Sequence, residues 1–199
     1  LDGVIHCAGI RRDGLCRGQS YEEFRQVLAP KVLGGKYVLD AALRGPVDFV
    51  VLLSSLTALV PSPGQTAYAA ANAALDALAW QYSEGTTQVM SIDYGPWAET
   101  GMVADASMRS RLDAVGLAPM ATVDAVDSFF GALELHKTKV VISGGASASA
   151  LTEAMRRTPS TSPRVESSVK NPDTIEASSP MPPMNGVANG REVSDFLRA

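Results

Sequence analysis

A regular alternation of short apolar runs with stretches of helical spacing constrains this chain most. The apolar runs are Val4–Ala8, Asp48–Ser54, Val89–Asp93 and the shorter Val140–Ile142. Nearly continuous apolar runs of this length are typical of parallel strands that are covered on both faces. The pattern therefore predicts strands of a buried parallel sheet.

Helical spacing fills the gaps between these runs. Tyr21–Leu43 repeats apolar residues three and four apart, although Pro30 must start, kink or interrupt that helix. Ala67–Tyr82 is rich in Ala and Leu, which favour helices, and Val123–Leu135 is amphipathic. The resulting order, β-α-β-α-β-loop-α-β, predicts an α/β fold with helices on both faces of the sheet. Ligands of such folds bind at the carboxyl ends of the strands.

Composition separates a folded part from a tail. Residues 1–145 contain all of these periodic segments, whereas Ser, Thr, Pro, Asn and Gly dominate from Ala146 onward. A segment of that kind cannot bury enough apolar surface to offset its ordering entropy. We therefore expect residues 146–190 to form a flexible, disordered Ser/Pro-rich linker. Residues 191–199 regain helical spacing and are expected to start a downstream domain.

Charge and cysteine usage argue against several classes of function. The net charge of −4 leaves no basic footprint for nucleic acid, and no apolar run approaches the roughly 20 residues of a membrane helix. Cys7 and Cys16 are too few for a disulfide framework, so we expect free thiols in the cytoplasm, with Cys7 buried in its strand. His6 and His136 lack metal-ligand spacing, and no metal site is expected. Asp93 and Glu99 are expected to have surface roles.

Polar residues follow or flank the predicted strands at one edge of the sheet. Tyr68 and Asn72 are four residues apart on a predicted helix and share a face, Ser55 ends a strand, and Lys31 lies on the preceding helix. Hydride addition to a ketone creates an alkoxide that a tyrosine hydroxyl can protonate. A serine hydroxyl can donate to the carbonyl oxygen where negative charge develops, and an asparagine can anchor a water that returns the proton.

The chain resembles the short-chain dehydrogenase/reductase superfamily and, within it, the ketoreductase domains of modular polyketide synthases. The matching stretches are Gly3–Leu15, Phe24–Leu39, Asp48–Ala79 and Asp93–Met102. The superfamily has Tyr-x-x-x-Lys where this chain has Tyr68-Ala-Ala-Ala-Asn72, with Lys31 on the earlier helix. That exchange is characteristic of polyketide and animal fatty acid synthase ketoreductases. The resemblance implies that residues 1–145 form the C-terminal, catalytic part of a Rossmann-like fold.

The resemblance also implies a role for each catalytic residue. Ser55 would polarise the substrate carbonyl and Tyr68 would donate the proton. Lys31 would tune Tyr68 and hold the nicotinamide ribose, while Asn72 would support the proton relay. Ser54 is the alternative serine, but the serine thirteen residues before the tyrosine is Ser55.

The cofactor that the resemblance implies is NADPH. The residues expected to contact it are Ala8, Gly9, Lys31, Ser54, Tyr68, Gly95, Pro96 and Thr100. The Gly-rich turn that receives the pyrophosphate is absent from the sequence, since no G-x-G-x-x-G motif occurs. We therefore expect the piece to bind cofactor poorly, and to be inactive, when it is alone.

The activity implied is reduction of a 3-oxoacyl thioester to the 3-hydroxyacyl thioester within a polyketide synthase. The expected partners are an acyl carrier protein, which presents the acyl chain on its phosphopantetheine arm, and the neighbouring synthase domains. Residues 191–199 would begin that carrier domain. Two alternatives stay open: a degenerate module with only a structural role, and a stand-alone short-chain alcohol dehydrogenase.

Overall fold

The computed structural model describes residues 1–99, 118–145, 152–153 and 156. Thr100 and most of the predicted linker and downstream segment lie outside the described residues. The elements are β1 (Gly3–His6), η1 (Cys16–Gly18), α1 (Tyr21–Ala42), β2 (Phe49–Ser55), η2 (Leu56–Ala58), α2 (Thr66–Gln81), β3 (Gln88–Tyr94), α4 (Thr122–Glu134) and β4 (Lys139–Ile142). Every strand and helix predicted within residues 1–145 is present, with its ends shifted by at most one or two residues.

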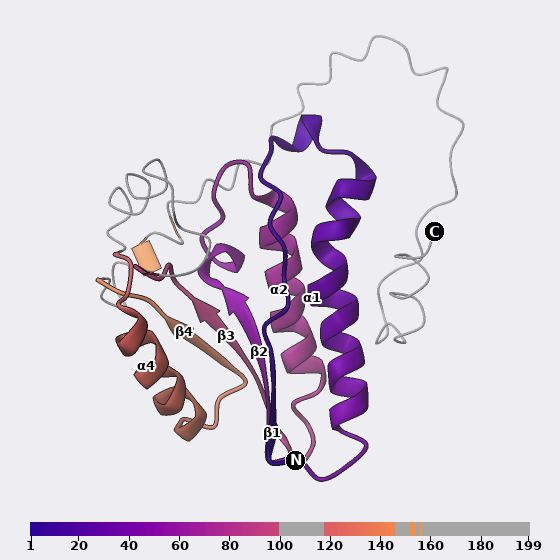
Figure 1. Ribbon diagram of the computed structural model, residues 1–199, viewed down its shortest axis with the longest axis vertical. Coiled ribbons are helices and arrows are strands. Elements are labelled where there is room, and N and C mark those ends of the chain that lie inside the picture. The colour runs from indigo at the N-terminus through magenta and orange to yellow at the C-terminus, as the bar shows by residue number, and fades with distance from the viewer. Residues whose placement is uncertain (100–117, 146–151, 154–155, 157–199) are drawn as a thin grey trace. The chain divides into compact units, whose positions relative to one another are not determined.

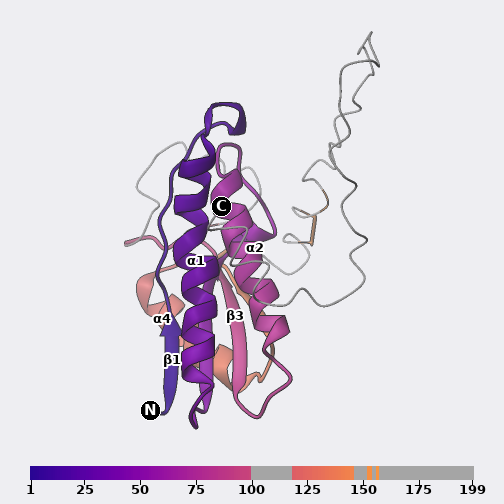
Figure 2. The same cartoon turned by 90° about the vertical axis from the view of Figure 1, so that its right-hand side faces the viewer.

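The described strands form one parallel sheet in the order β1-β2-β3-β4. Alternate side chains of β2 point to opposite faces: Val50 and Leu52 pack with α1 and α2, whereas Val51 packs with α4. Figures 1 and 2 show α1 and α2 side by side on one face and α4 on the other. This arrangement confirms the predicted Rossmann-like α/β class with helices on both faces.

Helix α1 continues through Pro30 as a single element, so the residue neither starts nor interrupts the helix. The His6 Nε2 of β1 lies 3.1 Å from the Pro30 carbonyl oxygen, which accepts its hydrogen bond. A Cβ atom on Gly35 would lie only 2.8 Å from Leu75 of α2, so this glycine allows α1 and α2 to pack closely. These contacts fix α1 against the sheet and thereby fix the position of Lys31.

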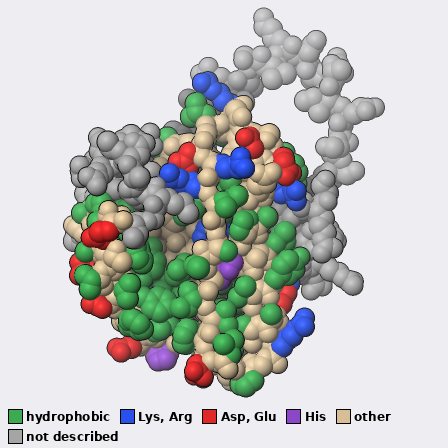
Figure 3. All heavy atoms as spheres, viewed as in Figure 1, with side chains coloured by type: hydrophobic (Ala, Val, Ile, Leu, Met, Phe, Trp, Pro, Cys, Tyr) green, Lys and Arg blue, Asp and Glu red, His purple; other side chains and the backbone are tan. Residues whose placement is uncertain are grey.

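Strand β1 is less covered than its apolar sequence predicts. The strand ends at His6 rather than Ala8, and Cys7 is exposed, so the prediction of a buried Cys7 was wrong. Ile5 pairs with Val51 and faces the α4 side, where it is 49% exposed. The reason is that α4 packs over β3 and β4, while β1 forms the edge of the described sheet. Figure 3 shows hydrophobic side chains gathered on this face between α4 and β1.

None of the helices within the described residues combines the length and the apolar character that crossing a bilayer requires.

Candidate functional site

Lys31 is a buried cation beside the carboxyl ends of the strands. Its side chain is 4% exposed, and its Nζ donates a hydrogen bond of 2.8 Å to the carbonyl oxygen of Leu53 in β2. A Cβ atom on Gly9 would lie 2.9 Å from Lys31 Cε, so a larger residue here would displace the lysine stem. Burial lowers the pKa of Lys31 to about 8, although the charges of Cys7 and Asp76 act in the opposite direction.

Tyr68 lies in the first turns of α2, and Asn72 follows it by one turn. The Lys31 Nζ lies 5.9 Å from the centroid of the Tyr68 ring. Asn72 is fully buried, and its Nδ2 donates a 2.7 Å hydrogen bond to the Tyr68 carbonyl oxygen. Its Oδ1 is also buried and has no hydrogen-bond partner among the described residues. A buried acceptor of this kind costs about 1–3 kcal/mol when unpaired, so it favours a donor such as a water or a ligand.

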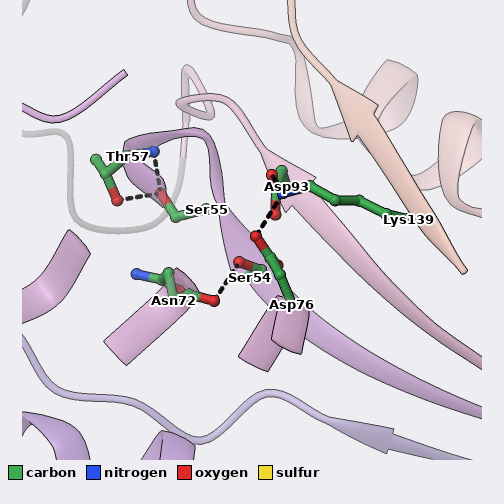
Figure 4. A network of polar contacts seen from close by, with 7 residues as sticks. All are labelled: Ser54, Ser55, Thr57, Asn72, Asp76, Asp93 and Lys139. Atoms are coloured by element: carbon green, nitrogen blue, oxygen red, sulfur yellow. Dashed lines mark hydrogen bonds and ion pairs between the residues drawn. The ribbon is translucent and has the colours of Figure 1, made fainter. Parts of the chain in front are cut away.

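The two serines at the end of β2 have different environments (Figure 4). Ser55 Oγ accepts hydrogen bonds from the Thr57 backbone N–H at 3.2 Å and from the Thr57 hydroxyl at 3.0 Å. With its lone pairs occupied, the Ser55 hydroxyl can still donate its own proton. Ser54 is buried instead, and its Oγ donates a 3.2 Å hydrogen bond to the Asn72 carbonyl oxygen. The geometry therefore favours Ser55 over Ser54 as the group that meets a ligand.

The remaining predicted cofactor contacts follow β1 and β3 at the same edge of the sheet. Ala8 is exposed and Gly9 is half-buried just after β1. The Gly95 N–H donates a 2.7 Å hydrogen bond to the Ile142 carbonyl oxygen. A Cβ atom on Gly95 would lie only 3.2 Å from Ser143. The Pro96 carbonyl oxygen accepts a 2.9 Å hydrogen bond from the Met120 N–H. These bonds hold the backbone after β3 beside the open edge.

The structure thus brings Gly9, Lys31, Tyr68 and Asn72 together, and Ser55 lies at the end of β2, two residues beyond the Leu53 carbonyl that Lys31 contacts. In the described part of the chain, no hydrogen bond joins Tyr68 to Ser55 or to Lys31. The spare N–H groups of Lys31, the orphaned Asn72 Oδ1 and the glycine backbone at Gly9 fit the nicotinamide and ribose end of a dinucleotide. The sequence has no Gly-rich turn for the pyrophosphate end.

A buried charge cluster behind this site was missed by the sequence analysis. Lys139 Nζ in β4 donates a 2.5 Å hydrogen bond to Asp76 Oδ2 in α2 and lies 3.0 Å from Asp93 Oδ2 in β3 (Figure 4). Asp93 has no exposed surface, so the prediction of a surface role for it was wrong, whereas Glu99 is exposed as expected. One signal was available: Asp93 interrupts an apolar run. Nothing in the sequence marked Lys139.

Electrostatics within this cluster are strongly perturbed. Burial, reinforced by the Asp76 carboxylate and opposed by Lys139, raises the pKa of Asp93 to about 7. Burial alone would lower the pKa of Lys139, but its bonds to Asp76 and Asp93 raise it above the ordinary value. Within the described ranges, no group of His, Cys, Asp and Glu side chains is arranged to hold a metal ion.

Comparison with known proteins identifies relatives of this arrangement. Residues 1–99 match the family model described as "KR domain". Polyketide synthase PksN of Bacillus subtilis (strain 168) is 35% identical over 152 residues, which are 73% of this chain and 3% of the synthase. Pikromycin polyketide synthase component PikAII of Streptomyces venezuelae is 40% identical over 126 residues, which are 60% of this chain and 3% of that component.

A solved structure agrees with these sequence matches. The crystal structure of a ketoreductase domain from the bacillaene assembly line superposes with a TM-score of 0.70 at 30% identity. The match covers 78% of this chain and 39% of that one. The chain therefore spans a small fraction of the curated relatives and less than half of the solved domain.

Proposed function

Because the chain belongs to the ketoreductase-domain family of polyketide synthases, we propose that it provides the catalytic residues for NADPH-dependent reduction of a 3-oxoacyl thioester. The product would be the 3-hydroxyacyl thioester. One observation carries the proposal: the buried Lys31 ammonium of α1 lies 5.9 Å from the Tyr68 ring of α2. Tyr68 shares its face of α2 with Asn72.

NADPH, when bound, would supply the hydride. The Ser55 hydroxyl would donate a hydrogen bond to the substrate carbonyl oxygen, and Tyr68 would transfer its proton to that oxygen as negative charge develops on it. The Lys31 ammonium would stabilise the charge left on the Tyr68 oxygen. Asn72 Oδ1, which lacks a donor among the described residues, would accept from a water that returns the proton.

The proposed cofactor contacts lie at the open edge of the sheet. Lys31 donates to Leu53 and has further N–H groups for ribose hydroxyls. The backbone at Ala8 and Gly9 would line the ribose, and Gly95 and Pro96 would approach the nicotinamide. Thr100 is kept as a predicted contact outside the described residues, and Ser54 is not, because its hydroxyl is used inside the fold.

The partners are part of the proposal. Both curated relatives are polyketide synthases of which this chain spans only a few per cent. We propose that an acyl carrier protein presents the substrate on its phosphopantetheine arm and that other synthase domains are neighbours. The linker at residues 146–190, the downstream domain from residue 191 and a cytoplasmic location remain predictions.

The test is a fused reductase in which this chain follows the part of the bacillaene ketoreductase domain that it does not cover. We expect NADPH-dependent reduction of a β-keto thioester, and a loss of about 10²–10⁴-fold in kcat for Tyr68→Phe, since general acid catalysis contributes about that much. Tyr37→Phe, at an exposed tyrosine of α1, is the matched control.

Equal rates for the Tyr68→Phe variant and the parent would rule out the proposed mechanism. A fused protein that is folded but binds no NADPH would instead favour the structural module.

A further inference from the structure

The cluster of Asp76, Asp93 and Lys139 joins three elements of the fold. Asp76 lies on α2, Asp93 on β3 and Lys139 on β4, and the side chains of Asp76 and Lys139 are 9% and 21% exposed. One partly buried ammonium therefore faces two carboxylates that are largely shielded from water. Breaking a buried ion pair by removal of one partner commonly costs several kcal/mol, so such a cluster strongly restricts how its elements can move.

Two carboxylate oxygens of the cluster lack a donor, and a third has only an ion-pair contact. Asp93 Oδ1 and Asp76 Oδ1 are buried and have no hydrogen-bond partner among the described residues, whereas Asp93 Oδ2 lies 3.0 Å from Lys139 Nζ. Lys139 is within ion-pair distance of Asp93 but makes its hydrogen bond to Asp76. A proton on one carboxyl group would supply the missing donor and reduce the excess negative charge.

The cluster is connected to the proposed catalytic residues through α2. Asp76 follows Asn72 by one helical turn, and both are on the buried face of the helix. Ser54 pairs with Asp93 in the sheet register and donates to the Asn72 carbonyl oxygen. Asp76 also contributes to the electrostatic environment of Lys31 on α1. The contacts of the cluster therefore help to fix where Tyr68 and Asn72 lie relative to the strand ends.

We propose that Asp76 is a positioning residue, tethered by Lys139 and by a proton shared with Asp93, that holds the Tyr68 and Asn72 face of α2 against the sheet. The positioning role rests on the proposed reductase function, whereas the shared proton does not. The charged groups that face Asp93 are Asp76 from α2 and Lys139 from β4, and the raised pKa of Asp93 agrees with a proton held near neutral pH.

The shared proton is tested without an activity assay. Carbonyl-¹³C NMR of the full chain labelled at aspartate follows the Asp93 carboxyl from pH 4 to 9, with the signal assigned by its loss in Asp93→Asn. We expect a midpoint near 7 that moves down in Asp76→Asn, because the neighbouring negative charge is removed, and does not move in Asp40→Asn. A titration midpoint below 5, or a midpoint that is the same in the parent and in Asp76→Asn, would contradict the shared proton.

The positioning role is tested in the fused reductase. Asp76→Leu removes the tether, so we expect kcat to fall at least ten-fold while KM for the thioester changes less than two-fold. Asp76→Asn keeps an oxygen that can accept from Lys139 and should restore most of kcat. Circular dichroism checks that each variant is folded, and Asp76→Ala, which also lacks an acceptor for Lys139, replaces the Leu variant in every comparison if Asp76→Leu unfolds.

The outcomes separate the two proposals. An active parent with unchanged kcat in folded Asp76→Leu contradicts the positioning role, as does an Asn variant no better than a folded Leu variant. An inactive parent whose Asp93 still titrates near 7 contradicts the reductase function and leaves the shared proton established.

Discussion

Two lysines of this chain, Lys31 buried and Lys139 partly buried, have opposite electrostatic environments. Lys31 has a backbone carbonyl as its hydrogen-bond partner at the proposed active site, and burial lowers its pKa to about 8. Lys139 faces two aspartates behind that site, and its pKa is raised. Among the described residues, Lys31 has no carboxylate within ion-pair distance, so its remaining N–H groups are available to a ligand. Lys139 is fixed by its counter-charges.

The difference lies in the elements that carry them. Lys31 is on α1; its stem packs against Gly9, and its Nζ donates a hydrogen bond to the Leu53 carbonyl oxygen of β2. Lys139 opens β4, whose register places it beside Ser91 and near Asp93. A lysine that contributes to reaction chemistry needs an environment that destabilises its charge, whereas a lysine that holds a fold needs the reverse. Four substitutions test this contrast.

The largest effect is expected from Lys139→Met. Two buried carboxylates would lose their cation, and breaking a buried pair from one side costs about 3–5 kcal/mol. The free energy of unfolding, measured by urea denaturation at pH 7, should fall by that amount. A loss below about 1 kcal/mol would mean that Lys139 behaves like a surface lysine and that the contrast fails.

Lys31→Met should raise the free energy of unfolding at pH 7, whereas Lys139→Met should lower it. The folded pKa of about 8 lies below the ordinary 10.5, so the charged lysine destabilises the fold at pH 8 and below, and the cost is relieved as pH rises toward 10.5. At about 1.4 kcal/mol per pH unit, the stability gap between variant and parent should narrow by about 3 kcal/mol between pH 7 and 10.5. Urea denaturation at both pH values measures it, and a pH-independent gap would contradict the lowered pKa.

Gly9→Ala should have a smaller effect on stability and a larger one on activity. The new methyl group would meet Lys31 Cε at 2.9 Å, and the flexible lysine stem can move aside. We expect a loss of about 1 kcal/mol in unfolding free energy, together with a clear loss of kcat in the fused reductase. Gly14→Ala, where a Cβ has nothing within 4 Å, is the control that should leave both unchanged.

The smallest effect is expected at the Lys36–Asp40 pair of α1. Both side chains are partly exposed, although the Tyr82 hydroxyl also donates a 2.7 Å hydrogen bond to Asp40. Asp40→Asn should cost less than about 1 kcal/mol, in line with surface ion pairs. A cost comparable to that of Lys139→Met would show that burial does not distinguish the two aspartate partners.

Local patterns predicted most of the fold. The apolar runs located each strand, and the Ala- and Leu-rich spacing located α2, because both signals arise within a few consecutive residues. The four residues Lys31, Ser55, Tyr68 and Asn72 were also chosen from the sequence, and the structure gathers them near one edge. Their catalytic roles stay predictions.

What the sequence could not give depends on neighbours that are distant along the chain. Asp93 was assigned a surface role because it lies on a strand while Glu99 lies in a loop, so the two were not expected to form a carboxylate pair. The β3–β4 register instead brings Lys139 to Asp93. Cys7 was assigned to the interior because its run is apolar, yet β1 stops one residue earlier. In both cases the burial of the side chain depended on which strand or helix packs beside it.

Strand β1 affects how the isolated chain behaves in solution. It pairs with β2 along one side, and no other described strand borders it. Such a margin offers N–H and C=O groups that can recruit a strand from another molecule, and the exposed Ile5 beside it adds apolar surface. Because the match covers only 39% of the bacillaene domain, the fused reductase can cover this margin, and it should associate less than the isolated chain. In the isolated chain, a charged residue at position 5 should lower self-association without altering the proposed catalytic residues.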